Sequence, residues 1–163
     1  MIAAALFALS LFGERQTLFE RGQQITTRHH VGGWTVRVSW DRFTGAISCA
    51  VNKGRVEFSN DVLIFHSNPE VDTSDAIFRV DGGPARSVRE ATYDDQRRGY
   101  YRSGGPLANP SAGEVALPSF YVTGAKWVYI RANPGRAPDG FDVRHFPEAL
   151  ALARAKKCPG IGP

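Results

Sequence analysis

The feature that most constrains the fold of this 163-residue chain is a strict alternation of apolar and polar side chains over residues 33–41, GWTVRVSWD. Every second residue is large and apolar, namely Trp34, Val36, Val38 and Trp40. Successive side chains of a β-strand point to opposite faces of a sheet, whereas helical side chains repeat every 3.6 residues. The segment therefore predicts a half-buried strand with these four residues on one face.

Seven further segments predict a mostly β protein. The turn DRFTG leads into the first of them, and Gly45 can supply the positive φ that such a turn needs. In the strand after it, Ile47, Cys49 and Val51 would share one face. Residues 84–113 lack regular patterning and predict a long loop. The predicted strands cover residues 46–51, 54–59, 62–67, 75–83, 114–118, 125–132 and 141–146.

The last element predicted is a helix over residues 147–157, PEALALARAKK. Pro147 suits a first helical turn, where its missing N–H costs least. Ala149, Leu150 and Ala153 would form the buried stripe. With 17 Gly and 10 Pro, the composition favours many turns over a helical bundle. The predicted fold class is therefore α+β and mostly β: an antiparallel sandwich or half barrel with the C-terminal helix packed on it.

The start of the chain predicts an export signal. Residues 2–12, IAAALFALSLF, are apolar except for Ser10, but they are too few for the roughly 20 residues of a spanning helix. No Lys or Arg precedes them, which would fit a true start further upstream. The alternative is a buried N-terminal helix of a cytoplasmic protein. The expected organisation is a signal-like segment over 1–13, a linker or short helix over 14–31, and a single β-rich domain over 32–163, with no membrane span in the mature chain.

The chain has two cysteines, Cys49 and Cys158, and four roles are open to them. A zinc site is disfavoured because neither has a Cys-x-x-Cys or His-x-x-x-His partner. Nothing local marks Cys49 as an activated nucleophile. Two unrelated buried thiols would fit a cytoplasmic protein with reduced cysteines. The preferred role is a disulfide that ties the C-terminal helix to the sheet, which requires an oxidising compartment.

Charge and motifs narrow the function further. The net charge is +4, and the excess lies in residues 81–163, which hold 12 Lys/Arg against 8 Asp/Glu. Such a surface attracts nucleic acid, anionic headgroups or acidic polymers, or only keeps the protein soluble. Walker, Gly-x-Gly-x-x-Gly, His-Glu-x-x-His and Gly-x-Ser-x-Gly motifs are absent. The sequence predicts no cofactor, no metal site and no specific nucleic-acid partner.

Isolated histidine, acidic and tryptophan residues carry weaker signals. His29 and His30 lie in a polar segment and are predicted to be solvated. Asp94 and Asp95 would point apart in an extended chain, so they do not predict a glycosidase pair. His66, at a strand end, is expected to be a hydrogen-bonded edge residue. Trp34, Trp40 and Trp127 are expected in the core, with a ligand platform as the alternative.

One stretch has the composition of a binding site, YDDQRRGYYRSGG over residues 93–105. Its arginines supply planar hydrogen-bond donors beside aromatic rings that can stack, which suits sugars, anionic polymers or single-stranded nucleic acid. The alternative is an exposed loop in which Asp94 and Asp95 neutralise nearby arginines. The candidate ligand-binding residues are Arg97, Arg98, Tyr100, Tyr101 and Arg102.

Four segments together resemble a family of small exported proteins of Gram-negative bacteria related to invasion-associated locus B. They are the Trp-led strand GWTV, the cysteine-bearing ISCAV, the run VALPSFYVTGAKWVYIR, and the closing FDVRHFPEALALA. A cysteine-bearing segment typical of the middle of that family is absent from this chain. The resemblance implies a periplasmic or envelope-associated β-rich domain and carries over no catalytic residue.

The expected function is a non-enzymatic periplasmic, secreted or envelope-associated protein that binds a partner protein or an anionic or sugar polymer. The main alternative is an envelope hydrolase, which a pocket joining a histidine to Cys49 or to a carboxylate would favour. Loss of ligand binding on replacing Arg97, Arg98 and Tyr101 would favour the binding protein.

Overall fold

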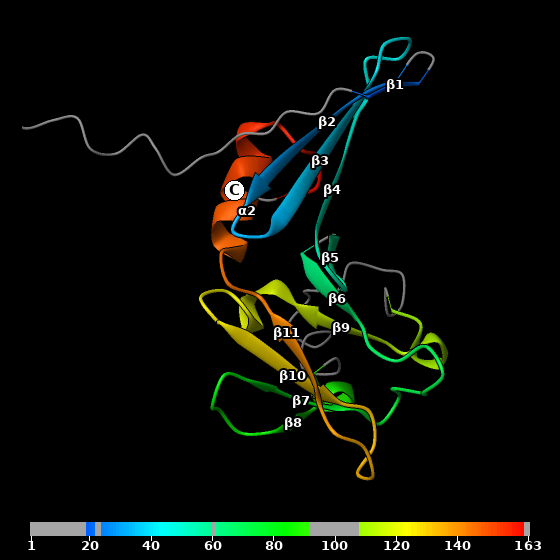
Figure 1. The fold of residues 1–163 in the computed structure, drawn as a ribbon, viewed down its shortest axis with the longest axis vertical. Coiled ribbons are helices and arrows are strands. Elements are labelled where there is room, and N and C mark those ends of the chain that lie inside the picture. The colour runs from blue at the N-terminus through cyan, green and yellow to red at the C-terminus, as the bar shows by residue number, and fades with distance from the viewer. Residues whose placement is uncertain (1–18, 22–23, 60, 92–107, 162–163) are drawn as a thin grey trace, which may run out of the picture.

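The computed structural model describes residues 19–21, 24–59, 61–91 and 108–161, which form two antiparallel sheets and a C-terminal helix (Figure 1). The first sheet has the strand order β1 (Phe19–Arg21), β2 (Gln24–Val31), β3 (Trp34–Asp41), β4 (Ile47–Lys53), β5 (Val56–Ser59), β6 (Val62–His66) and β9 (Glu114–Pro118). The second sheet has the order β11 (Asp139–Asp142), β10 (Trp127–Arg131), β7 (Ile77–Val80) and β8 (Arg86–Ser87). Short 3-10 helices flank β9 as η1 (Pro110–Ala112) and η2 (Ser119–Tyr121).

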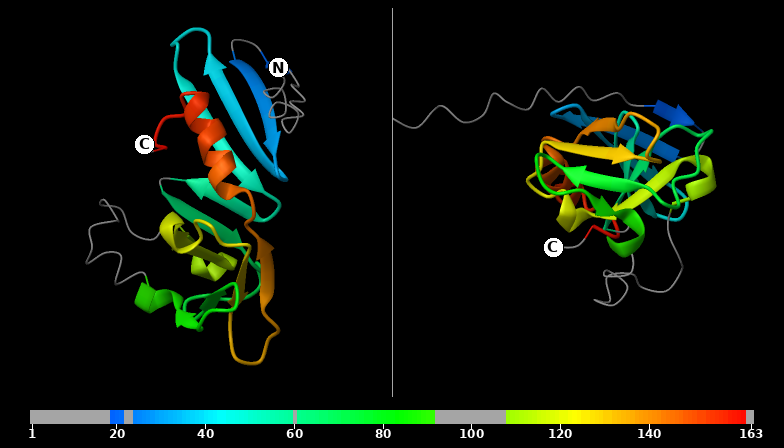
Figure 2. Two further views of the ribbon diagram at one scale, coloured as in Figure 1. Left: turned by 90° about the vertical axis from the view of Figure 1, so that its left-hand side faces the viewer. Right: turned by 90° about the horizontal axis from the view of Figure 1, so that it is seen from below.

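The first sheet is covered by different elements along its length. Helix α2 (Phe146–Ala155) lies along the long strands β2, β3 and β4, as the left view of Figure 2 shows. The second sheet covers the β5–β6–β9 part, where Phe65 of β6 meets Phe141 of β11 edge to face at 5.2 Å between ring centroids. The predicted α+β, mostly β sandwich with a packed C-terminal helix is confirmed.

Helix α2 begins one residue before the predicted segment and buries the predicted stripe. Ala149, Leu150 and Ala153 are buried together with Phe146, while the rest of the helix surface is largely exposed. The connection from β11 into the helix is held against β3, because the Trp34 indole N–H donates to the Arg144 carbonyl at 2.8 Å. A Cβ placed on Gly32, whose φ is +53°, would lie 2.3 Å from the Cβ of His145. The β2–β3 turn therefore needs glycine where it meets the start of the helix.

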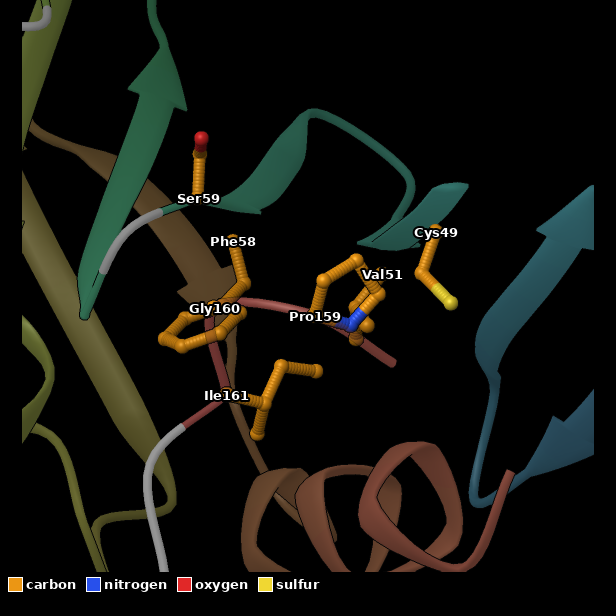
Figure 3. Close-up of a pocket in the computed structure, with 7 residues that line it drawn as sticks. All are labelled: Cys49, Val51, Phe58, Ser59, Pro159, Gly160 and Ile161. Carbon is orange, nitrogen blue, oxygen red and sulfur yellow. The ribbon is translucent and has the colours of Figure 1, made fainter. Parts of the chain in front are cut away.

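The two cysteines meet beyond the end of α2. Their sulfur atoms lie 2.07 Å apart, at disulfide-bonding distance, and their Cα atoms 5.6 Å apart. This confirms the predicted pairing of Cys49 with Cys158 over the interpretation as separate thiols. A small cavity of about 110 Å³ lies next to Cys49, between β4 and β5 and the residues after the helix (Figure 3). It is lined by Cys49, Val51, Phe58, Ser59, Pro159, Gly160 and Ile161.

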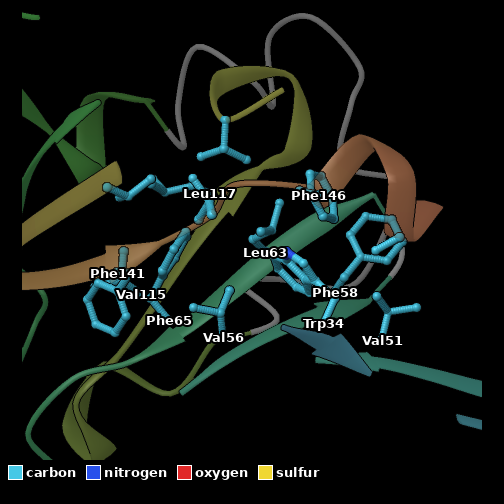
Figure 4. Close-up of a cluster of buried hydrophobic side chains, with 14 of the residues drawn as sticks. Trp34, Val51, Val56, Phe58, Leu63, Phe65, Val115, Leu117, Phe141 and Phe146 are labelled. Atoms are coloured by element: carbon cyan, nitrogen blue, oxygen red, sulfur yellow. The ribbon is translucent and has the colours of Figure 1, made fainter. Parts of the chain in front are cut away.

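The core is continuous from the helix to the second sheet (Figure 4). Phe146 of α2 joins the helix to the first sheet, with ring centroids 5.2 Å from Trp34 of β3 and 5.4 Å from Phe58 of β5. Burying side chains of this size stabilises a fold by roughly 1.5–3 kcal/mol each. The largest fully buried side chains include Trp34, Leu63, Phe65, Phe78, Leu117, Ile130 and Phe146.

The prediction of a linker or short helix over residues 14–31 is wrong for Gln24–Val31, which forms β2 and pairs along its whole length with β3. Its polar residues gave no periodic signal, and the pairing with β3 supplies the backbone hydrogen bonds that hold it extended. The prediction of solvated histidines is wrong for His29 of β2, which is buried, and holds for His30, which is exposed. The strand predicted over 141–146 is instead Asp139–Asp142, because the chain turns into α2 after it.

The core prediction for the three tryptophans holds for one of them. Trp34 is 0% exposed, whereas Trp40 is 46% and Trp127 is 37% exposed. Trp40 lies on the same face of β3 as Trp34 but nearer the β3–β4 turn. In the described part of the chain, no helix has the length and apolar character needed to cross a bilayer.

Candidate binding site

The binding residues predicted from the sequence, Arg97, Arg98, Tyr100, Tyr101 and Arg102, lie outside the residues that the structure describes. The same two kinds of side chain, aromatic and guanidinium, come together elsewhere, on the outer face of the second sheet. We call this surface the β10 face and define it by Trp127, Tyr129, Arg79, Arg131 and Arg144.

Strand β10 supplies the aromatic part of the β10 face. Its inward residues Val128 and Ile130 are buried, so the alternate residues Trp127, Tyr129 and Arg131 point outward. The Trp127 and Tyr129 rings lie 6.2 Å apart between centroids with planes only 22° from parallel. The two rings are thus held nearly parallel as a stacked pair on the outer surface of the sheet, and we call this pair the platform.

Three arginines surround this platform. Arg79 lies opposite Tyr129 in the β7–β10 register, with its guanidinium carbon 5.6 Å from the ring centroid. The guanidinium carbon of Arg144 lies 5.8 Å from the Trp127 ring centroid. Both distances fit cation–π contacts, in which a guanidinium lies over a ring. The donors of Arg79 stay available to a ligand, whereas those of Arg144 bind Asp142.

A hollow of about 290 Å³ adjoins the platform. Arg79 and Arg131 border it on either side of Tyr129, and Ile77 and Pro138 add apolar wall. The flank of the Tyr129 ring stays open because β11 places Gly140 there, where a Cβ would lie 3.4 Å from the ring. The β10 face thus combines a stacked pair of aromatic rings with a recess lined by two cations.

The acidic groups near the β10 face are already engaged. Asp142 accepts two hydrogen bonds from Arg144, each 2.9 Å, and lies 3.1 Å from Lys53 Nζ. The Arg144 hydrogen bonds, with a further contribution from Lys53, hold the pKa of Asp142 far below its usual range against the opposing effect of burial. The Asp142 carboxylate therefore stays ionised and is engaged by both cations, Arg144 and Lys53, whose summed charge exceeds its own by one.

The charge that remains on the β10 face is positive. Asp81 accepts the backbone N–H groups of Lys126 at 3.0 Å and Trp127 at 2.8 Å, so it is engaged with the start of β10. Neither Arg79 nor Arg131 forms an ion pair with any carboxylate of the described chain. Two unpaired guanidinium groups beside two rings suit a ligand that has both flat apolar faces and anionic groups.

A second hollow, of about 420 Å³, bears on the hydrolase alternative. It is lined by Ser67, Asn68, Arg136 and Asp139 among others. Here the Ser67 hydroxyl donates to the Asp139 carboxylate, which also accepts from Arg55 at 3.2 Å. A serine nucleophile of the triad type needs a histidine to take its proton. His66 instead lies 3.4 Å from Glu114 and 4.0 Å from Glu57. It is at a strand end as predicted, but not at a sheet edge, because β6 pairs with both β5 and β9. The hollow therefore lacks the arrangement that would favour a hydrolase.

The structure also bears on two further interpretations, a nucleophilic cysteine and a metal site. Cys49 is bonded to Cys158, which leaves no thiol for nucleophilic chemistry. Over the described residues, no three His, Cys, Asp or Glu side chains converge in a way that could hold a metal ion. Comparisons of the chain with protein-family models, curated proteins and solved structures find no match.

The sequence does not predict the β10 face, because its pattern favours a core position for Trp127. The alternation of residues 125–132 correctly placed Trp127, Tyr129 and Arg131 on one face. Arg131 in that set is the signal that this face is exposed, because an arginine is rarely buried without a partner. Its presence marks the whole face as the solvent side of the strand.

Proposed function

We propose that this protein is a non-enzymatic, envelope-associated binding protein whose β10 face binds an anionic polysaccharide. The observation that carries the proposal is the pair of nearly parallel rings, Trp127 and Tyr129, beside the unpaired guanidinium groups of Arg79 and Arg131. The apolar face of a sugar ring stacks on an aromatic ring, and guanidinium donors bind carboxylate, sulfate or phosphate groups bidentately. A polymer gains affinity by engaging several of these groups at once.

A periplasmic or secreted location supports the choice of a polysaccharide over a nucleic acid. The Cys49–Cys158 pair lies at disulfide-bonding distance, and such bonds persist in oxidising compartments. The apolar segment at residues 2–12 and the resemblance to the exported locus B-related proteins support the same location. Polysaccharides with acidic groups are abundant in that setting, whereas nucleic acids are not.

The test is binding of the purified chain to immobilised heparin and alginate, with neutral dextran as the uncharged comparison. Stacking on a ring contributes about 1–3 kcal/mol, so Trp127→Ala and Tyr129→Ala should each weaken binding roughly ten- to hundredfold. Phe120→Ser, which removes an exposed ring from η2, is the matched control and should leave the affinity unchanged.

Charge and access to the β10 face are tested separately. Arg79→Gln and Arg131→Gln should each reduce the salt dependence of binding, with exposed Arg89→Gln as the control. Gly140→Val removes no contact group but places a branched side chain against Tyr129, so it should weaken binding as well. Native affinity in all of these variants would refute the proposal, and shortening of the polymer on incubation would favour the envelope hydrolase instead.

A further inference from the structure

The β3–β4 hairpin extends past the part of the sheet that α2 covers. Val38 and Cys49 are cross-strand partners, and Cys49 is bonded to Cys158 just beyond the helix. The next pair on the same face, Trp40 and Ile47, lies two residues closer to the turn. Figure 1 shows the turn at one end of the molecule, beyond the end of α2.

Large apolar side chains are gathered at this end. Trp40 is 46% exposed, Phe43 81% and Ile47 37%, and they make up three of the five large apolar side chains most exposed in the described chain. Trp40 lies opposite Ile47 of β4 and Ile25 of β2, and Phe43 lies in the turn itself. We call Trp40, Phe43 and Ile47 the hairpin tip. A soluble surface rarely gathers such residues without a partner.

The turn that presents Phe43 is held rigidly. The Asp41 carboxylate accepts the backbone N–H groups of Phe43 at 2.8 Å and Thr44 at 3.2 Å. The Gly45 N–H donates to the Asp41 carbonyl at 2.8 Å, and a φ of +71° makes glycine the fitting residue there, as its position in the turn predicted. The hairpin tip is therefore organised before it meets a partner, so little conformational entropy is lost on binding.

The charge around the hairpin tip is positive. Asp41 is the only acidic residue in residues 24–53, and it is engaged in the turn. The neighbouring strand β1 adds Glu20, which pairs with Ile25, and Arg21, so its charges cancel. Arg42 lies next to Phe43 and is exposed. On the opposite face of the sheet, Arg28 and Arg37 are direct cross-strand partners, an unfavourable placement of like charges that a nearby anionic surface would relieve. The hairpin thus carries an apolar tip followed by cations.

We infer that the hairpin tip inserts into the interface of a lipid bilayer that contains anionic headgroups. Phe43 enters the acyl boundary, Trp40 lies at headgroup level, and Arg42 binds lipid phosphate. A convex tip fits a deformable interface better than it fits a second copy of the chain. Three fully exposed aromatic side chains would bury about 600 Å², and the hairpin tip, with Trp40 46% and Ile47 37% exposed, offers less than that. A stable dimer buries roughly 800 Å² per partner. This inference does not depend on the β10 face.

The experiment measures co-sedimentation of the full chain with vesicles of phosphatidylcholine, with and without phosphatidylglycerol. Because burying one large apolar side chain is worth about 1.5–3 kcal/mol, Phe43→Ser should weaken binding about ten- to hundredfold. Phe120→Ser is again the matched control, since it removes an exposed ring from η2 and leaves the hairpin tip intact. Arg42→Gln should weaken binding only to the vesicles that contain phosphatidylglycerol, and high salt should abolish that difference.

Two further measurements keep the inference falsifiable. Brominated lipids should quench the tryptophan fluorescence of the native chain, and Trp40→Phe should lose most of that quenching while still binding. The apolar segment at residues 2–12 could also bind vesicles, so Leu6→Asp is compared with Phe43→Ser. The inference is overturned if Phe43→Ser binds like the native chain, if only Leu6→Asp abolishes binding, or if Phe43→Ser changes the oligomeric state in solution instead of vesicle binding.

Discussion

Removing the Cys49–Cys158 bond should cost the protein much of its stability. The two residues are 109 apart in sequence, so the bond closes most of the domain into one loop. A crosslink across a loop of that length lowers the entropy of the unfolded chain by an amount worth about 5 kcal/mol at 25 °C. The free energy of unfolding of a domain of this size is about 5–15 kcal/mol. The Cys49→Ala/Cys158→Ala variant should therefore lose at least a third of it.

The structure also predicts where the variant changes first. Phe146 and Leu150 hold the first half of α2 on the sheet through buried apolar contacts that do not depend on the bond. The end of the helix has smaller buried side chains, with Ala153 the last of them. Without the crosslink, the amides of the last helical turn should therefore exchange with solvent faster, while those near Phe146 stay protected.

The assay is urea denaturation followed by circular dichroism and tryptophan fluorescence. Replacing the sulfurs with alanine also removes some buried volume, so the native chain under reductant is the control that breaks the bond and keeps the atoms. Both should show a lower midpoint, and the slope should rise slightly because the uncrosslinked unfolded state is more expanded. A loss under about 1 kcal/mol in both would refute the loop-closure reasoning.

Three other predictions address single contacts. Because Arg144 lowers the pKa of folded Asp142 below the value of about 3.9 in an unfolded chain, Asp142 stabilises the fold above pH 4 and loses that contribution as the pH falls further. Acid titration of unfolding should show this loss in the native chain and not in Asp142→Asn. Gly32→Ala should lower the free energy of unfolding by about 3 kcal/mol, because its Cβ meets His145 and its φ is positive; normal stability would contradict the close approach. Phe146→Ala should cost about 3–5 kcal/mol in the same measurement, and a smaller loss would mean that the helix repacks.

Much of the architecture could be predicted because the signals are local. The alternation of residues 33–41 and the helix-forming residues after Pro147 act over a few neighbours, and both segments adopt the predicted structure. The pairing of Cys49 with Cys158 could be predicted because only two cysteines exist. By contrast, Gln24–Val31 is a strand only because β3 lies beside it, and its own residues carry no such signal.

What the sequence by itself determined is the period of the strongly patterned elements, such as β3, β10 and α2, and therefore which of their residues share a face. What only the tertiary structure decided is which face is covered and for how far. Trp34 and Trp40 share a face, yet α2 covers the first and ends before the second. Trp127 is exposed because the buried side of β10 is set by the first sheet behind it. Periodicity is a property of the local backbone, whereas burial depends on which distant segment packs against it.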